Sequence, residues 1–404
     1  MLQTIDIDAL GLDAGAHLLI RQGLHDVPPG GELCVTGRAS GWEAQLTAWC
    51  RNQGHGCRFS EHDLAHDGRT VAIITKSASA SGRWRGALNT GSADPTQPNS
   101  VAACADARWG LAARGATVEA GSPAMHFRLN EKHEIWADSA AELYAQASAA
   151  QWHPDTAIDW DEAFELPDIV EDAIVQVMTY MIENEEAALI VPARFLGQIH
   201  PHYREIQALL SIQIADEARH IDVFTRRVRL KNREPALSTA GGQASLKTLL
   251  DEPDFSTSQF LLSVLGEGTF VSLLNFLHVH APDPVTRQIA RLAARDEARH
   301  VAFGMAHLQH RIEQEPGLRA TLANAVQSRN DALSATSGLN EEVFDALILL
   351  AAGEFTPGAI EKGYTRVQQL MLDMAAGRQA RLEKLGFKKT DAQQLSSLHT
   401  RNFM

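Results

Sequence analysis

The chain has 404 residues, of which 45% are hydrophobic and 21% are charged. This composition is typical of a globular protein, and the length exceeds what one small core needs, so we expect two domains. Thirty-six Lys and Arg against 50 Asp and Glu give a net charge of −14. Such a charge disfavours nucleic-acid phosphates and anionic membrane surfaces, and we expect neither as a partner.

The N-terminal residues and the cysteines indicate a cytoplasmic protein. Residues 1–8 lack the basic and apolar regions of a signal peptide. No stretch is expected to reach the length of a membrane-spanning helix. The cysteines form no CxxC pair, which disfavours a disulfide framework, an iron–sulfur cluster and a thiolate zinc site. They are Cys34, Cys50, Cys57 and Cys104.

The first part of the chain predicts a small α+β domain. Residues 31–37 and 69–76 have strand composition between turn residues. Residues 18–25 and 42–52 carry apolar side chains at helical spacing. The following segment is rich in Ser, Ala, Gly, Pro and Asn and predicts a linker. We therefore expect an α+β domain over 1–76, a linker and lead-in segment over 77–165, and a helical domain over 166–404.

Long helices are expected after residue 167, so the predicted fold class is mainly α. Four segments are apolar on a helical period and are separated by short breaks that contain proline; they are residues 168–197, 205–230, 256–279 and 284–313. Helices of about 25 residues are about 38 Å long, as in a four-helix bundle. Two extra C-terminal helices, over 341–350 and 357–385, are expected to pack outside this bundle.

An internal repeat carries the chemical information. Asp-Glu-Ala-Arg-His occurs at residues 216–220 and again at 296–300, displaced by 80 residues. The copies fall on the second and fourth expected helices, and Glu and His three positions apart share one helical face. A single copy is typical of a solvated helix face. Two identical copies on alternate helices instead indicate a shared site, which would contain Glu217, His220, Glu297 and His300.

The first and third helices are then expected to supply one carboxylate each. On the third helix, Glu267 stands alone in an apolar run, 30 residues before Glu297. On the first helix, acidic residues cluster at Glu183, Glu185 and Glu186. Glu186 precedes Glu217 by 31 residues, the best match to the spacing in the second half. We therefore expect Glu186 as the fourth carboxylate, with Glu183 as the alternative.

These residues predict a dinuclear metal site. A Glu from each of two helices plus Glu-x-x-His from each of two others is the inward-facing ligand set of ferritin-like di-iron and di-manganese proteins. Four carboxylates balance two divalent ions, whereas buried unpaired carboxylates would each cost several kcal/mol. Oxygen and imidazole ligands without sulfur suit iron or manganese. We expect two iron ions, or a Mn/Fe pair, held by Glu186, Glu217, His220, Glu267, Glu297 and His300, with the four glutamates also catalytic.

The Asp and Arg of each motif are expected to support the histidines. A metal-binding imidazole normally donates its second N–H to an acceptor such as a carboxylate, so Asp216 and Asp296 are each expected to accept from the opposite motif. Arg219 and Arg299 would neutralise these aspartates. The alternative is an ordinary surface ion pair within each motif.

The doubled Asp-Glu-x-Arg-His motif resembles the ferritin-like di-iron oxygenases, in particular the bacterial multicomponent monooxygenases, over residues 168–313. The resemblance implies a di-iron centre that activates O₂ and oxidises an organic substrate. Three departures leave the subfamily open. Val271 stands where hydrocarbon monooxygenases have Thr, and Phe224 stands where ribonucleotide reductase small subunits have a radical Tyr. Ala293 replaces the third His of aminobenzoate N-oxygenases.

The N-terminal segment resembles the TusA/SirA-like sulfur carriers over residues 11–59, in Pro28-Pro29-Gly30 and in Trp-Cys-Arg-Asn-Gln-Gly-His at 49–55. In that family, Cys-Pro-x-Pro opens the first helix and its Cys carries the persulfide. The matching residues here are Ala-Gly-Ala-His at 14–17, so the family's sulfur transfer is not expected. A docking or substrate-shielding role is expected instead.

The leading functional hypothesis is an O₂-dependent di-iron oxidoreductase of monooxygenase type that hydroxylates or otherwise oxygenates a small organic substrate. A separate reductase or ferredoxin would supply electrons, and a homodimer is the candidate assembly. A substrate pocket is expected beside the metals, with ordinary core packing as the alternative; its residues would be Phe224, Phe270, Val271, Ala293 and Gly304. The alternative function is a ferritin- or bacterioferritin-like iron-binding or peroxide-detoxifying protein, which the long segment before the bundle disfavours.

Overall fold

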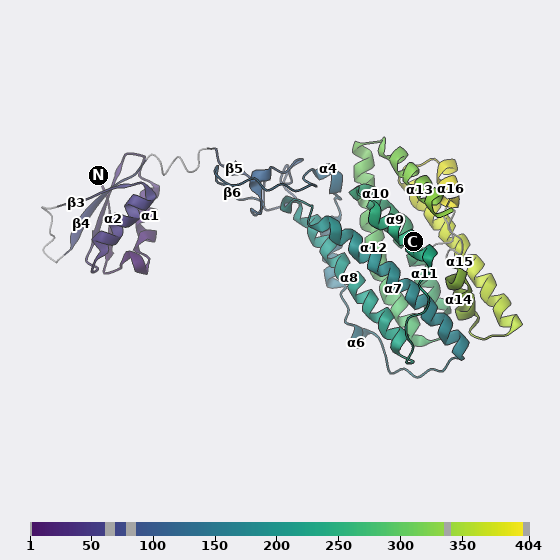
Figure 1. Ribbon diagram of the computed structural model, residues 1–404. Coiled ribbons are helices and arrows are strands. Elements are labelled where there is room, and N and C mark those ends of the chain that lie inside the picture. The colour runs from purple at the N-terminus through teal and green to yellow at the C-terminus, as the bar shows by residue number, and fades with distance from the viewer. Residues whose placement is uncertain (1, 61–68, 78–85, 335–340, 399–404) are drawn as a thin grey trace. The chain divides into compact units, whose positions relative to one another are not determined.

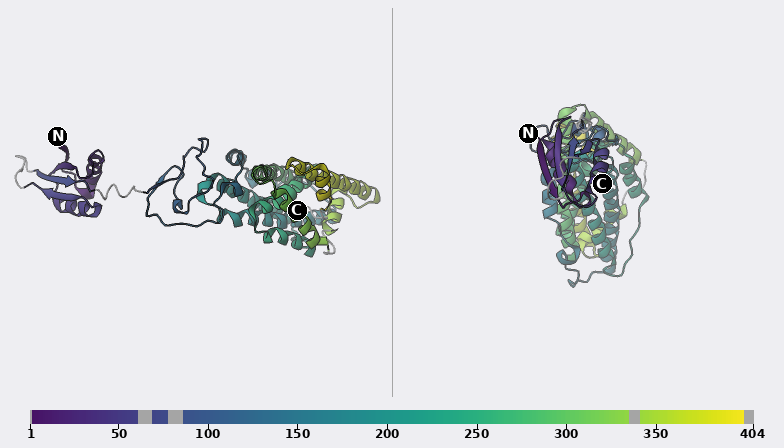
Figure 2. Two further views of the ribbon diagram at one scale, coloured as in Figure 1. Left: turned by 90° about the horizontal axis from the view of Figure 1, so that it is seen from above. Right: turned by 90° about the vertical axis from the view of Figure 1, so that its left-hand side faces the viewer.

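The computed structural model describes residues 2–60, 69–77, 86–334 and 341–398. The chain divides into two units, which are described separately below (Figures 1 and 2). The first comprises Met1–Asp94 and Ala112–Ala124, and the second comprises Pro95–Leu111 and Met125–Met404. The three-part division predicted from composition stays a prediction.

The first unit contains a four-stranded sheet with two helices. The strand order is β1 (Gln3–Asp8), β2 (Glu32–Gly37), β4 (Thr70–Thr75) and β3 (Gly56–Phe59). β1 is parallel to β2, and the other neighbours are antiparallel. The helices are α1 (Ala16–His25) and α2 (Trp42–Gln53). Leu33 and Val35 of β2 pack in a core with Ile20 and Leu46 from these helices.

Two of these strands, β2 and β4, and both helices lie where the sequence predicts them. The other two strands, β1 and β3, were not predicted, because they lie at the edges of the sheet and bury few side chains. The residues that match the Cys-Pro-x-Pro motif lie at the start of α1. The resemblance to sulfur carriers remains a proposal.

The second unit is built on four long helices, as predicted. They are α7 (Asp168–Leu196), α8 (Arg204–Arg229), the continuous helix formed by α10 (Phe255–Gln259), η4 (Phe260–Glu267) and α11 (Gly268–His280), and α12 (Pro284–Gln314). The segment η4 is a π-helix. α7 packs on α8, α11 on α12, and α12 on α8. The predicted fold class, a helical bundle preceded by a small α+β region, is confirmed.

Aspartate caps begin two of these helices, α10 and α12, at breaks that the sequence predicts. The Asp283 carboxylate accepts a hydrogen bond from the backbone N–H of Thr286 at 2.8 Å, and Pro284 occupies the first turn of α12. Asp254 accepts from the backbone N–H of Thr257 at 2.8 Å at the start of α10. Such caps satisfy backbone donors that have no partner within the helix.

Further helices pack around the bundle. Those before it are α4 (Lys132–Ile135), α5 (Ala140–Ala149) and α6 (Pro154–Ala157); those after or between are α9 (Ala240–Asp251), α13 (Leu318–Ser334), α14 (Glu341–Ala352), α15 (Pro357–Lys384) and α16 (Lys389–Ser397). The predicted C-terminal helices correspond to α14, which packs on α7, and α15, which packs on α11. In the first unit, β5 (Leu88–Asn89) and β6 (Thr117–Val118) form a short two-stranded antiparallel sheet.

The expectation that no stretch reaches the length of a membrane-spanning helix is wrong. The helix Phe255–His280 has a mean hydropathy of 1.6 over an 18-residue window and is long and apolar enough to cross a membrane. The expectation failed because the helix predicted over residues 256–279 is already long enough and carries Glu267 as its one Asp, Glu, Lys or Arg. Of that apolar window, 78% is buried inside the protein, which is typical of a core helix.

A buried guanidinium ties three bundle segments together. The side chain of Arg227 is 0% exposed and donates to Glu171 of α7 at 2.6 and 3.0 Å. It also donates to Asp283, the cap of α12, at 3.1 and 3.3 Å, and to the hydroxyl of Thr286 at 3.0 Å. Each of these guanidinium N–H groups has an acceptor, and the two carboxylates balance the positive charge of Arg227. The network therefore joins α7, α8 and α12.

Replacing Arg227 should therefore destabilise the bundle. Arg227→Met leaves the carboxylates of Glu171 and Asp283 buried without their partner, and we expect a loss of about 3–5 kcal/mol in the free energy of unfolding. Arg229→Met is the matched control, because Arg229 lies two residues away and is exposed; its effect should stay within about 0.5 kcal/mol. Chemical denaturation of both variants measures the difference. Equal stability of the two variants would contradict the assignment.

Candidate metal centre

Six buried side chains from the four bundle helices converge in the second unit. α7 contributes Glu185, α8 contributes Glu217 and His220, η4 ends in Glu267, and α12 contributes Glu297 and His300. They form two groups that can each hold a metal ion: Glu185, Glu217, His220 and Glu297 in one, and Glu217, Glu267, Glu297 and His300 in the other. In each group, one ligand atom per residue lies within 4.8 Å of the others. Glu217 and Glu297 belong to both groups, so the two ion positions are adjacent.

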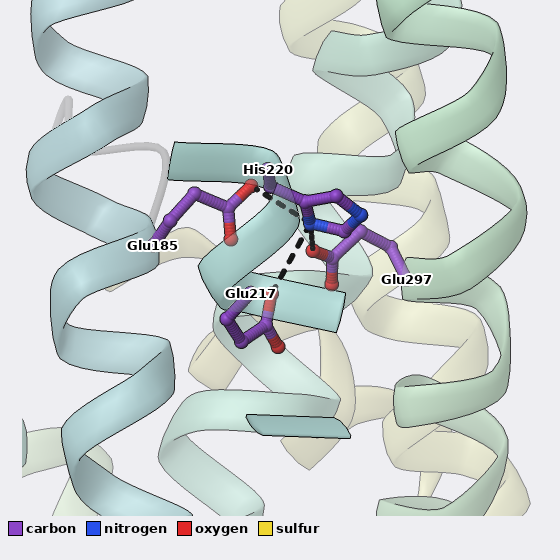
Figure 3. A group of neighbouring side chains, drawn as sticks. All are labelled: Glu185, Glu217, His220 and Glu297. Atoms are coloured by element: carbon purple, nitrogen blue, oxygen red, sulfur yellow. Dashed lines mark ion pairs between the residues drawn. The ribbon is translucent and has the colours of Figure 1, made fainter. Parts of the chain in front are cut away.

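The first group shows how the side chains point. In Figure 3, Glu185, Glu217 and Glu297 surround the imidazole of His220. The Nδ1 atom of His220 lies 3.4, 3.2 and 3.4 Å from the carboxylate oxygens of these three residues. In the second group, the Nδ1 atom of His300 lies 3.0 Å from Glu217 and 3.4 Å from Glu297.

The carboxylate predicted on the first helix is wrong by one residue. Glu186 is exposed and Glu183 is half-buried, whereas Glu185 is 1% exposed and faces the cluster. The prediction matched the loop spacing of the two halves, but the connection from α7 to α8 contains a short helical turn at Pro201–Tyr203. The helical period is the better signal, because Glu185 is in phase with buried positions of α7: Met178, Met181, Ala188 and Pro192.

The oxygen and nitrogen atoms of the cluster are suited to binding metal ions. In the described part of the chain, several of these atoms are buried without a hydrogen-bond partner: Glu185 Oε1, both oxygens of Glu217 and of Glu297, Glu267 Oε2, and Nδ1 of His220 and His300. Buried polar atoms normally have partners, since leaving them unpaired costs free energy. All of these atoms belong to the two groups, and all are ligand types that iron and manganese accept.

The protonation of the cluster also indicates a site for cations. Burial, and next the charge of Glu297, raise the pKa values of Glu185 and Glu267 well above the ordinary value for Glu. Burial lowers the pKa values of His220 and His300, but the surrounding carboxylates together outweigh it and raise these pKa values well above the ordinary value; Glu185 contributes most for His220 and Glu217 for His300. Without metal, the cluster therefore retains protons in place of the missing cations.

The motif aspartates lie where the sequence analysis places them. The Nε2 atom of His220 lies 3.2 Å from Asp296 Oδ2, and that of His300 lies 3.4 Å from Asp216 Oδ2. Each histidine thus contacts the aspartate of the opposite motif. When Nε2–H donates to the aspartate, the lone pair of Nδ1 points into the cluster and is available to a metal.

The motif arginines connect the two aspartates. Arg219 donates to Asp216 at 2.5 Å and to Asp296 at 2.9 Å. Arg299 donates to Asp296 and lies 3.9 Å from Asp216. Because both aspartates are fully buried and Arg219 is only 10% exposed, these contacts differ from the surface ion pairs considered as the alternative.

Two supporting residues come from the segment between α5 and α6 and were not predicted. Gln151 donates to Asp216 at 2.8 Å, and the indole N–H of Trp152 donates to Asp296 at 2.7 Å. The Trp152 ring stacks on His220 at 19°, with 6.5 Å between the ring centres, and Arg219 lies 4.6 Å from the Trp152 ring centre. No period or motif marks this segment, so tertiary contacts alone reveal its role.

A third unpredicted residue positions the third-helix carboxylate. Gln213 is buried and donates to Glu267 at 3.2 Å. It lies four residues before Glu217 on α8, so the same helical face that carries the motif also carries this contact. That spacing is the sequence signal that could have identified it.

The residues expected to line a substrate pocket have different surroundings. Phe224 lies beside His220, with 6.3 Å between the ring centres, while Phe270 and Ala293 are buried and Val271 is half-buried. Gly304 does not open a cavity, because a Cβ there would lie 2.7 Å from the Ser263 side chain. This glycine instead lets α12 approach η4 closely.

No family model and no curated protein matches this chain. Solved structures of R2-like ligand-binding oxidases are similar to it. A variant with an aerobically reconstituted Mn/Fe cofactor has a TM-score of 0.45 and 15% identity, covering 63% of this chain and 94% of its own. The protein from Sulfolobus acidocaldarius has a TM-score of 0.40 and 15% identity, covering 59% and 91%. A variant with an Fe/Fe cofactor has a TM-score of 0.43 and 15% identity, covering 62% and 94%.

The shared glutamates predict graded losses of metal. Glu185 belongs to one group only, so Glu185→Ala should lower the bound metal from two ions per chain to about one, whereas Glu297→Ala should remove most of both. Glu186→Ala is the matched control, since Glu186 is exposed, and it should keep both ions. Elemental analysis of protein from iron-supplemented cells gives the counts. Two bound ions per chain in Glu297→Ala would contradict the assignment of Glu297 to both metal groups.

Metal binding should also release protons. Because Glu185, Glu267, His220 and His300 all have raised pKa values in the metal-free cluster, ions must displace their protons. We expect the affinity for Fe²⁺ or Mn²⁺ to rise with pH between about 5 and 8, because deprotonated ligands bind metal. Calorimetric titration under anaerobic conditions, in buffers of different ionisation enthalpy, counts the protons released. A count of zero would contradict the electrostatics described here.

Proposed function

We propose that this chain is a non-haem dinuclear-metal oxidoreductase that uses O₂ to oxidise a small organic substrate, with monooxygenation as the reaction type. The observation that supports it is the pair of four-residue groups that share Glu217 and Glu297. When bound, two iron ions, or a Mn/Fe pair, supply the electrons that reduce O₂. The residues of the chain determine where the ions bind and what surrounds them.

The shared glutamates and the histidines have distinct roles in this proposal. Glu217 and Glu297 would each bind both ions and hold them at neighbouring positions. Glu185 and Glu267 would each bind one ion, and the histidines would bind through Nδ1 because Nε2 faces an aspartate. Asp216 and Asp296, linked through Arg219, would hold both imidazoles in one orientation and one tautomer.

Burial of the site supports oxidation chemistry over exchange of ions with the solvent. All six ligand residues are at most 3% exposed. On the side of His220, the Trp152 ring and the Arg219 guanidinium form a stacked layer. A site that excludes bulk water protects reactive species from side reactions and strengthens the electrostatic interactions inside it.

The remaining parts of the proposal follow from the sequence. The chain holds no CxxC pair for an iron–sulfur cluster, so we propose that a separate reductase or ferredoxin delivers the electrons. The first unit lacks a cysteine at the position of the sulfur-carrier nucleophile, and we propose a docking or shielding role for it. A cytoplasmic location and a homodimer belong to the same proposal.

An O₂ pulse tests the function. After anaerobic reduction of the iron-loaded protein, we expect O₂ consumption in near-stoichiometric amount with the metal pairs, followed by a stop until electrons are supplied again. Glu186→Ala should behave like the unmodified protein, and Glu297→Ala should consume almost none. An oxygen electrode and a spectrum of the metal centre record both. Continued uptake of added Fe²⁺ into a large assembly, far beyond two ions per chain, would overturn the proposal in favour of iron storage.

A further inference from the structure

A cavity lies beside the π-helix η4, on the side away from the metal cluster. It is lined by residues of η4, α13, α15 and α16 and is partly open to solvent. Most of its lining is apolar, with Leu261 and Leu265 from η4 and Leu333 and Leu382 from α13 and α15. Leu265 lies two residues before Glu267, so it points away from the face that carries this glutamate.

A buried cation that has no counter-charge among the described residues lines this cavity. Arg378 of α15 is 5% exposed, and its Nε and Nη1 atoms are buried without a hydrogen-bond partner in the described residues. A buried charge normally has a partner, because an isolated ion in an apolar environment costs several kcal/mol. Arg227 in the same unit is also buried, but its guanidinium forms ion pairs with Glu171 and Asp283.

A second guanidinium increases the positive charge. Arg381 lies one turn after Arg378; its Nε donates to the Val264 carbonyl at 2.7 Å, while its Nη2 has no partner in the described residues. Burial lowers the pKa of both arginines to about 10, and the charge of Arg381 adds to the effect on Arg378. Both therefore remain cationic at neutral pH, in a chain whose net charge is −14.

Arg381 also contacts the helix that ends in the metal-site glutamate. Arg381 binds the backbone of η4 at Val264. A Cβ at Gly268 would lie 2.4 Å from the Arg381 guanidinium, so glycine at this position makes room for the arginine. The cavity thus lies against the opposite side of the helix from the metal cluster.

We propose that this cavity binds a small organic anion with an apolar body, whose carboxylate pairs with Arg378 and whose apolar part lies against Leu261, Leu265, Leu333 and Leu382. The carboxylate would complete the missing ion pair, and charge-assisted hydrogen bonds to guanidinium are strong. The leucine walls favour a carboxylate with an apolar body over inorganic phosphate, which has no apolar surface to bury. This proposal does not depend on the function of the metal centre.

Calorimetric titration of the full-length protein with octanoate tests the proposal. We expect octanoate to bind at least tenfold more tightly than 1-octanol, and inorganic phosphate not to compete. Arg378→Leu should weaken octanoate binding roughly tenfold or more, since a hydrogen bond to a charged group is lost. Arg291→Leu, which removes one exposed arginine of α12, is the matched control and should leave the affinity unchanged. Equal affinity for octanoate and octanol, or unchanged binding by Arg378→Leu, would overturn the proposal.

Stability provides a second readout that does not need the ligand. Arg378→Leu removes an unpaired buried charge, so the ligand-free variant should melt roughly 2–4 °C higher than the unmodified protein, with a smaller shift on adding octanoate. A lower melting temperature would show that Arg378 has a structural partner, and would overturn the proposal. Glu297→Ala should still bind octanoate. Loss of binding there would place the carboxylate at the metal cluster and contradict this site while leaving the proposed function intact.

Discussion

The second unit depends on one electrostatic constraint: four carboxylates and two imidazoles are buried together in the core of a helical bundle. None of the six side chains is more than 3% exposed, so water cannot solvate their charges. The bundle provides a second layer in which two aspartates and two arginines fix the histidines, and Gln151 and Trp152 satisfy the aspartates. Many ligand atoms of the first layer have no hydrogen-bond partner among the described residues, and these unpaired oxygens can be satisfied only by cations or protons.

The sequence predicts most of the cluster because its signals are local. Glu and His three residues apart must share a helical face, and Glu267 is isolated in an apolar run, so these positions needed no knowledge of loops. The choice on α7 depended on comparing loops between the two halves and was wrong by one residue. The helical phase of α7 identifies Glu185, because its buried positions at Met178 and Met181 are in phase with it.

The rest could not be predicted because it depends on tertiary contacts or on backbone detail. Gln151 and Trp152 act from an irregular segment that no periodicity marks. The π-helix η4 lies in a run so apolar that every face looks alike, and its register is therefore invisible in the hydrophobic pattern. Small residues are equally ambiguous. Gly304 suggested a cavity, but it lets the Ser263 side chain approach closely, as Gly268 does for the Arg381 guanidinium.

The exchange of contacts between the two motifs has a consequence for how such a site can arise. Each histidine contacts the aspartate of the other motif, and both glutamates of the motifs belong to both ion positions. A half-length chain with a single motif would leave the Nε2 atom of its imidazole without an aspartate and could complete the site only by pairing with a second copy. Joining two copies in one chain removes that need and frees each half to diverge. The two halves differ here, since η4 is a π-helix whereas the corresponding segment of α7 is α-helical.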